Sequence, residues 1–223
     1  MLDRLAQLDV RLAGHAILGR EQDRAGLAED LVGLVSVLAP TADREEVEVW
    51  LIGREGLVGL PAILGGASLC FRRVVQVGGS ALRIPAGALR AACEQSPSLH
   101  RRLLPYADAV LVQAAQSGAC AARHSLDQRV ARWLMQARYS LGTDELPLTH
   151  ALLARLVGVR RASVTVAVGR LEASGVVSQR WSCIAVADPG RLELAACDCH
   201  RLIRARRDAA HVPARPLGYE AAG

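Results

Sequence analysis

The sequence predicts an α+β protein built from a small N-terminal β-roll or jelly roll, one long helix and a C-terminal helix-turn-helix domain. Three observations lead to this prediction. Residues 1–97 contain short strand-like segments separated by glycines, residues 98–122 carry a continuous helical pattern, and residues 123–207 contain two short helical segments joined at a glycine. Residues 208–223, with several prolines, glycines and alanines, are expected to form a flexible tail.

Strands are predicted in the N-terminal part. The clearest example is Glu46–Gly53, which alternates polar and apolar residues as a half-buried antiparallel strand does. Segments at Leu31–Leu38, Arg72–Val77 and Ala81–Ile84 predict further strands. The first thirty residues instead place leucine and alanine at helical spacing without strong caps. Whether the β-roll begins with a complete set of strands is therefore left open.

The long helix carries a seam of residues at alternating spacings of four and three. The seam consists of Leu99, Leu103, Tyr106, Val110, Gln113, Ser117 and Cys120. Two interpretations fit this pattern: pairing with the same helix of a second copy, or burial against the protein's own domain. We favour a dimer interface for Leu99 to Ser117, because the seam continues through successive heptads between two domains.

The helix-turn-helix is predicted from Leu148–Thr165 and from the helix before it. A capping box at Ser125 begins that preceding helix, which ends at Gly142–Asp144. Thr149 can cap the first helix of the motif, and Gly158 follows its last turn, where a left-handed backbone is needed. Two short strands and a last helix are expected to follow, at Val176–Arg180, Ile184–Ala187 and from Asp188 onward.

The second helix of the motif is expected to have one buried and one exposed face. The apolar stripe, with helical spacing, is Val164, Ala167, Val168 and Leu171. The residues that then face outward are Arg161, Ala162, Thr165, Val166 and Gly169. An outer face with alanine, valine and glycine is unusual for a helix that only meets water, so this face predicts a binding surface.

Such a helix suits the major groove of double-stranded DNA. Arg161 can donate two hydrogen bonds to a guanine edge, and Thr165 is expected to read a neighbouring base, while Val166 can touch a thymine methyl group. Other polar groups are placed for phosphate oxygens, which set the register of the protein on DNA. The candidate DNA-binding residues are Thr149, Arg160, Arg161, Ser163, Thr165, Val166, Arg170 and Arg180. The alternative is a helical hairpin that only packs in the core.

Composition agrees with a polyanionic partner. All 27 basic residues are arginines, and residues 123–223 hold 15 of them against nine acidic residues, whereas residues 1–122 hold 12 against 13. Aromatic residues make up only 3% of the chain, which argues against a protein that stacks single-stranded bases. We recognise no signal peptide, membrane span or catalytic arrangement of side chains, so we expect a cytoplasmic protein without enzymatic activity or membrane contact.

Several segments resemble the Crp/Fnr family of bacterial transcription regulators. They are the strand Glu46–Ile52 with the following Gly53–Pro61, then Cys120–Ser125, Arg132–Leu134, the helix-turn-helix and Ala195–His200. The resemblance covers roughly Asp30 to Arg204. It implies a cyclic-nucleotide-binding-like β-roll, a long dimerisation helix and a C-terminal winged helix-turn-helix. Family members bind two-fold symmetric DNA sites as homodimers, and RNA polymerase is a further candidate partner.

The departures from the family pattern concern the effector and the target sequence. Where members that bind cyclic AMP carry Gly-Glu-Leu, this chain has Gly59–Pro61, and where they carry an arginine followed by Ser or Thr and Ala, it has Cys70–Arg73. We therefore expect no dependence on cyclic AMP and no bound cofactor. Arg161 matches the family's base-reading arginine, but Ala162 and Val166 stand where glutamate and arginine often occur, so a different target sequence is expected.

The six cysteines allow a second function. They show no disulfide spacing, and the first is Cys70, so the N-terminal iron–sulfur cluster of the family's oxygen sensors is not expected. Cys183, Cys197 and Cys199 predict an alternative thiol- or metal-responsive sensor. We favour core cysteines and no metal site, because the Cys197-Asp198-Cys199-His200 segment has no second close pair of ligands. A degenerate regulator that only dimerises is a third alternative, and the effector, the target genes and the direction of regulation are left open.

Overall fold

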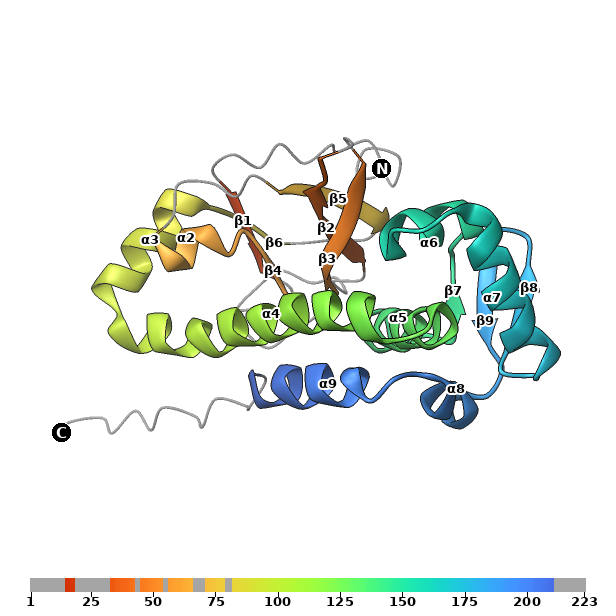
Figure 1. The fold of residues 1–223 in the computed structure, drawn as a ribbon. Helices are drawn as coiled ribbons and strands as arrows, with labels where there is room; N and C mark the ends of the chain where they lie inside the picture. Colours follow the sequence, from red (N-terminus) through yellow and green to blue (C-terminus); the bar gives the residue numbers. More distant parts are fainter. Residues whose placement is uncertain are drawn as a thin grey trace.

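The long helix α4 (Pro97–Arg123) organises the molecule. The computed structural model describes residues 15–18, 33–42, 45–53, 56–65, 71–78 and 82–210. The N-terminal strands lie along one side of α4, the helix-turn-helix region lies at one end, and α9 (Cys199–Ala210) lies along α4 on the side opposite the strands (Figure 1). The other parts are therefore placed relative to one another by α4.

Two three-stranded antiparallel sheets form the N-terminal part. One has the order β4 (Leu57–Val58), β1 (His15–Leu18), β6 (Leu82–Pro85), and the other has the order β3 (Glu46–Ile52), β2 (Leu34–Pro40), β5 (Arg72–Val77). The strand predicted from the alternation after Glu46 and the strand at Arg72–Val77 are confirmed, and the other two predicted strands are shifted by one to three residues.

Strand β1 corrects the helical pattern predicted for the first thirty residues. His15–Leu18 pairs with β4 and with β6, and these partners supply backbone hydrogen bonds that outweigh the local helical spacing. The rest of that pattern lies outside the described residues.

An apolar core lies between these sheets and α4. Its buried members include Val37, Trp50, Ile52, Leu57 and Val110. Two short helices pack around it, α2 (Pro61–Leu64) and α3 (Ala86–Gln95), and the sequence pattern predicts neither. Helix α3 is not predictable from its pattern because it buries only Leu89 and Cys93, one turn apart. Two buried positions are too few to show helical periodicity.

Helix α4 extends one residue beyond each end of the predicted helix over 98–122. Ser96 caps it by accepting a hydrogen bond from the Leu99 amide (3.4 Å). The first four residues of the predicted dimer seam pack against the β-roll core: Leu99, Leu103, Tyr106 and Val110. Tyr106 also donates a hydrogen bond from its hydroxyl to the carbonyl oxygen of Leu57 (3.0 Å). Within one chain, this part of the seam therefore faces the protein's own domain, as the second interpretation of the pattern expected.

The outer face of α4 carries a second stripe with the same heptad spacing. Its exposed residues are Leu104, Asp108, Leu111, Ala115, Gly118 and Ala122. Leu104 is 40% exposed and Leu111 is 63% exposed, which makes them the large apolar side chains that α4 presents to solvent. We call these six residues the outer α4 stripe.

The C-terminal part is a three-helix core with a small sheet. Helices α5 (Leu126–Leu141), α6 (His150–Val157) and α7 (Arg161–Ala173) pack with strands β7 (Glu145–Leu146), β8 (Val177–Arg180) and β9 (Cys183–Val186). The capping box predicted at Ser125 is present, and Gly142 ends α5 in the left-handed region (φ 71°). Trp133, Leu134, Leu153, Leu156 and Ile184 are fully buried here.

The last predicted helix is two helices. Asp188 caps α8 (Pro189–Ala195) as predicted, accepting from the Arg191 amide at 2.9 Å. Ala196 then adopts an extended backbone (ψ 156°), which ends α8 and lets the chain turn back before α9 begins. Helix α9 continues to Ala210, so residues 208–210 are helical and not part of a flexible tail as predicted. The rest of the predicted tail, residues 211–223, lies outside the described residues.

No helix of the described residues is both long enough and apolar enough to cross a membrane.

Candidate nucleic-acid interface

The turn between α6 and α7 is built as the sequence predicts. Thr149 caps α6 by accepting from the Leu152 amide (3.2 Å). Gly158 ends α6 with φ 69°, and a side chain at this position would also meet Val47 of β3, since a Cβ atom would lie 3.1 Å from Val47 Cγ2. The left-handed backbone therefore favours glycine here, and the close approach of Val47 adds to this preference.

Helix α7 has the predicted division into faces. Val164, Ala167, Val168 and Leu171 are buried, whereas Arg161, Ala162, Thr165 and Val166 are exposed and Gly169 is half-buried. Val166 is 52% exposed, which leaves a β-branched apolar side chain beside polar ones on the outer face. The buried stripe anchors α7 in the core of the C-terminal part, and the outer face is exposed to solvent, where a ligand can reach it.

The start of α7 carries two arginines that have no acidic partner among the described residues. Arg160, Arg161 and Ser163 are exposed, and the described residues place no carboxylate in an ion pair with either arginine. Arg160 occupies the N-cap position, and no side chain caps the helix. The uncapped amides and the helix dipole favour an anion at this end of α7.

Thr165 is held in place by its neighbours. Its hydroxyl lies 3.1 Å from Nδ1 of His150 on α6 and donates to the Arg161 carbonyl oxygen (3.1 Å). The predicted base-reading threonine thus contacts the first helix of the motif. Sequence reasoning did not anticipate this link, because the two residues are 15 positions apart and lie on different helices.

Arg170 and Arg180 already have acidic partners. Arg170 Nη1 lies 3.0 Å from Asp127 Oδ2 on α5, and Arg180 Nη1 lies 3.5 Å from Glu145 Oε1. Both pairs are solvent-exposed, and exposed pairs contribute only about 0–1 kcal/mol. A phosphate can bind Arg170 or Arg180 only by breaking these ion pairs, which costs a small amount of free energy. Binding to Arg160 or Arg161 breaks no such pair among the described residues.

The turn between β8 and β9 forms a wing that contains a residue missed in the sequence. Trp181 is 100% exposed at its tip, between Arg180 and Ser182, and Ser182 has a left-handed backbone (φ 52°). A tryptophan at the centre of a tight turn between two predicted strands is the signal that could have identified it.

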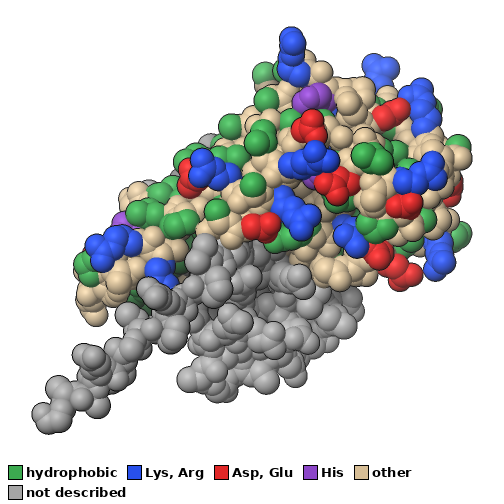
Figure 2. All heavy atoms as spheres, turned by 90° about the horizontal axis from the view of Figure 1, so that it is seen from below, with side chains coloured by type: hydrophobic (Ala, Val, Ile, Leu, Met, Phe, Trp, Pro, Cys, Tyr) green, Lys and Arg blue, Asp and Glu red, His purple; other side chains and the backbone are tan. Residues whose placement is uncertain are grey.

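The face that carries α8 and α9 differs from α7 in its charge pattern. Basic and acidic side chains are intermingled there (Figure 2), as in the pairs of Arg201 with Glu193 (3.3 Å) and of Arg206 with Asp108 (3.6 Å). Paired charges of both signs do not attract a polyanion. The exposed face of α7 and the wing therefore make the better candidate.

Two glutamates join the β-roll to the DNA-binding part. Glu46 lies 2.7 Å from Arg72 Nε and 2.9 Å from Arg155 Nη2 of α6, and these arginines, Arg72 first, lower the pKa of Glu46 to about 2. Glu48 accepts hydrogen bonds from Ser36 and from Trp133 Nε1 of α5 (2.7 Å), yet burial raises the pKa of Glu48 to about 7. Strand β3 thus contacts both α5 and α6.

The three cysteines of the predicted sensor do not all lie in one group in the structure. Cys197 and Cys199 lie beside Cys120 and His124, near the C-terminal end of α4, whereas Cys183 lies on β9 and is not part of this group. Cys120 and His124 were missed because they are 77 and 75 residues away from their partners in the sequence.

Comparisons with known proteins agree with this architecture. Residues 128–195 match the family model of the Crp-like helix-turn-helix domain. Comparison with curated protein sequences gave no match.

Solved structures show the same fold over most of the chain. FixK2 from Bradyrhizobium japonicum has a TM-score of 0.68 at 16% identity, covering 83% of this chain and 88% of its own. A CRP-family transcriptional regulator from Thermus thermophilus has a TM-score of 0.62 at 15% identity (82% and 88% covered). A crp/fnr-family protein from Eubacterium rectale has a TM-score of 0.60 at 18% identity (85% and 81% covered). The chain therefore carries a segment that matches the Crp-like helix-turn-helix domain, within a fold that it shares with solved proteins described as Crp/Fnr-family transcriptional regulators.

Proposed function

We propose that this protein is a sequence-specific, DNA-binding transcriptional regulator that acts as a homodimer in the cytoplasm. The observation that carries the proposal is the outer face of α7. Arg160 and Arg161 stand there without acidic partners among the described residues, next to the exposed side chain of Val166. Unpaired cations beside small apolar groups match the donors, acceptors and methyl groups of a major groove.

Each polar group of this surface has a proposed role. Arg161 and Thr165 read bases, and Val166 contacts a thymine methyl group. Phosphates are bound by Thr149, Arg160, Ser163 and Arg180, with Arg170 at the edge of the contact. Trp181 adds an aromatic surface at the wing tip, in position to lie against a sugar or phosphate beside Arg180. As a regulator of transcription, the protein would have RNA polymerase as a further partner.

Dimerisation is proposed through the outer α4 stripe. The predicted seam is occupied by the chain's own β-roll from Leu99 to Val110, so a second copy would meet Leu104 and Leu111 instead. Ala115, Gly118 and Ala122 are small enough to let two helices approach closely along the rest of the stripe. Two-fold symmetry would then place two α7 helices in successive major grooves, about 34–36 Å apart.

We also infer that DNA binding is independent of cyclic AMP. Leu60, in the position where members that bind cyclic AMP carry glutamate, is buried in the apolar core. Arg72, a candidate for the phosphate-binding arginine, is committed to Glu46. Both groups that would hold the nucleotide are therefore absent or engaged elsewhere.

Selection of bound DNA from a random pool tests this proposal. We expect an enriched motif with two-fold symmetry and half-sites one helical turn apart, obtained without added nucleotide and unchanged by cyclic AMP. If repeated rounds enrich no motif, the protein is not a sequence-specific regulator, and a motif without symmetry would reject the homodimer.

Arginine variants then test the surface on the selected site. Arg161→Ala should weaken specific binding by about 1–3 kcal/mol and relax one base position, because a bidentate contact to guanine is lost. Arg102→Ala, an exposed arginine near the opposite end of α4, is the matched control and should leave affinity unchanged at fixed salt. Arg170→Ala should lower the DNA affinity by less than Arg161→Ala does, because the charge of Arg170 is partly neutralised by Asp127. Equal affinities for Arg161→Ala and Arg102→Ala would show that α7 does not read DNA.

A further inference from the structure

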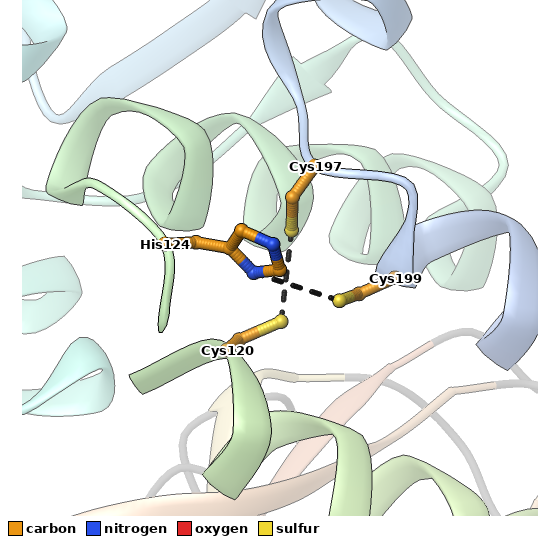
Figure 3. Close-up of side chains that lie close together, drawn as sticks. All are labelled: Cys120, His124, Cys197 and Cys199. Atoms are coloured by element: carbon orange, nitrogen blue, oxygen red, sulfur yellow. Dashed lines mark hydrogen bonds between the residues drawn. The ribbon is translucent and has the colours of Figure 1, made fainter. Parts of the chain in front are cut away.

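Four possible metal ligands meet where α9 begins beside the C-terminal end of α4. Cys120 and His124 come from α4 and its C-cap, one turn apart. Cys197 comes from the segment that joins α8 to α9, and Cys199 is the first residue of α9. Their side chains point toward one another (Figure 3), and one ligand atom from each lies within 4.8 Å of the others. The fold has gathered these side chains from two segments of the chain that are far apart in sequence.

The spacing of these atoms matches that around a single tetrahedral ion. Cys120 Sγ lies 3.6 Å from Cys197 Sγ, and Cys199 Sγ lies 3.7 Å from His124 Nδ1. Around zinc, with Zn–S of about 2.3 Å and Zn–N of about 2.0–2.1 Å, tetrahedral geometry places two sulfurs about 3.8 Å apart and a sulfur and a nitrogen about 3.6 Å apart. Two of the six distances among the ligand atoms therefore lie within about 0.2 Å of those around a single ion, and the other four are no longer than 4.8 Å.

The ligand set and its burial point to zinc. Three thiols and one imidazole form one of the common structural zinc sets. Cys120 is fully buried, Cys197 and Cys199 are 3% and 5% exposed, and His124 is half-buried, so the three thiols are shielded from solvent as in structural sites. An iron–sulfur cluster would need its ligands farther apart, because several iron and sulfide atoms must fit between them.

A buried arginine supplies the charge that such a site requires. Arg132 on α5 is 6% exposed, forms no ion pair with the described residues, and its Nε atom has no hydrogen-bond partner. Burial raises the pKa of the Cys120 thiol, and the positive charge of Arg132 acts in the opposite direction. Zn²⁺ bound by three thiolates and a neutral histidine carries a net charge of −1, and Arg132 would balance it.

A second polar group is placed to support the sulfurs. Gln116 Nε2 on α4 donates to Cys199 Sγ at 3.0 Å. Amide hydrogen bonds of this kind stabilise metal-bound thiolates. The pKa of the Cys199 thiol lies below its usual value. Burial alone would raise this pKa, but the hydrogen bonds from Gln116, Cys120 and Cys197 together have the larger, opposite effect.

We propose that Cys120, His124, Cys197 and Cys199 bind one Zn²⁺ ion that fastens α9 to α4. Farther along, α9 is held by Arg207, which donates to Ser140 Oγ (3.0 Å), and by the exposed pair of Arg206 with Asp108. The ion adds a fastening at the start of α9, next to the end of the outer α4 stripe. This proposal does not depend on DNA binding.

Metal analysis of the full-length protein tests the site. The protein is produced with zinc in the medium, purified under reducing conditions and analysed for zinc, iron and acid-labile sulfide. We expect about one zinc per chain. Cobalt(II) in place of zinc should give the intense visible bands of a tetrahedral site and a sulfur-to-cobalt charge-transfer band. Iron with sulfide, no bound metal, or an octahedral cobalt spectrum would each overturn the assignment.

Cysteine variants locate the ion. Cys199→Ser and His124→Ala should lose most of the zinc, whereas Cys183→Ser and Cys93→Ser, which change free cysteines outside the group, should keep it. Circular dichroism checks that each variant folds. If a variant does not fold, the cobalt spectrum of the unmodified protein still tests whether a tetrahedral site with thiolate ligands is present. Equal zinc loss in Cys183→Ser and Cys199→Ser would reject the proposed ligands.

Discussion

The interior of this protein and its proposed DNA-binding surface use the same residue types in opposite ways. Trp133 is 2% exposed where α5 meets β3, and its indole nitrogen donates to Glu48. Trp181 is 100% exposed at the tip of the wing. One side chain joins two parts of the chain, and the other is available to a partner. The comparison teaches that residue type indicates little about role until the position of each residue in the fold is known.

Substitution of the two tryptophans should give the largest difference in the free energy of unfolding. Trp133→Ala should lower the free energy of unfolding by about 3–5 kcal/mol, because it opens a cavity in the core and removes a donor from the half-buried Glu48. Trp181→Ala should change it by no more than about 0.5 kcal/mol. Urea unfolding measures both variants. A stability loss for Trp181→Ala as large as that for Trp133→Ala would show that the wing tip is packed and not free.

Adjacent residues on α4 extend the comparison to the proposed dimer. Val110 is 5% exposed and faces the β-roll, whereas Leu111 is 63% exposed on the outer α4 stripe. Leu111→Glu should weaken dimerisation by about 2–3 kcal/mol, because it removes apolar burial and places two like charges near the symmetry axis. Analytical ultracentrifugation measures the change, with Arg102→Ala as control. A dimer of unchanged affinity would place the interface elsewhere on the molecule.

Two glutamates on β3 give the most specific effect, because it depends on pH. Burial raises the pKa of Glu48 to about 7, so the folded protein favours its protonated form, and stability should fall as pH rises from about 4.5 through 7. The slope is at most about 1.4 kcal/mol per pH unit. Glu46 behaves oppositely: its pKa is lowered to about 2, so its contribution is present above about 4.5 and is lost on acidification.

Glu48→Gln isolates the contribution of Glu48 to this pH dependence. Glutamine keeps an acceptor for Trp133 and Ser36 but has no charge, so the decline in stability between roughly pH 5 and pH 8 should become shallower. Urea unfolding across this range measures it, and Glu45→Gln serves as the control because Glu45 is exposed. An unchanged slope in Glu48→Gln would mean that Glu48 stays ionised in the folded protein.

Sequence patterns predicted the elements that depend on local interactions. Ser125, Thr149 and Asp188 cap their helices as expected, because a cap needs only a side chain and an amide three residues away. The buried stripe of α7 and the exposed Arg161 were also predictable, since helical periodicity alone assigns them to faces. Strand β1 and the break at Ala196 were not, because pairing partners and chain reversal involve residues far away in the sequence.

By itself, the sequence determined the helix-turn-helix, its outer face and the resemblance to a family of regulators, because these rest on short-range spacing. The tertiary structure decided which face of α4 stays exposed, since the predicted seam fits both a second copy and the β-roll and only packing chooses between them. It also decided that Cys120 and His124, not Cys183, stand beside Cys197 and Cys199. The physical reason is the same in both cases: long-range contacts form only when α4, α9 and the β-roll are placed against one another.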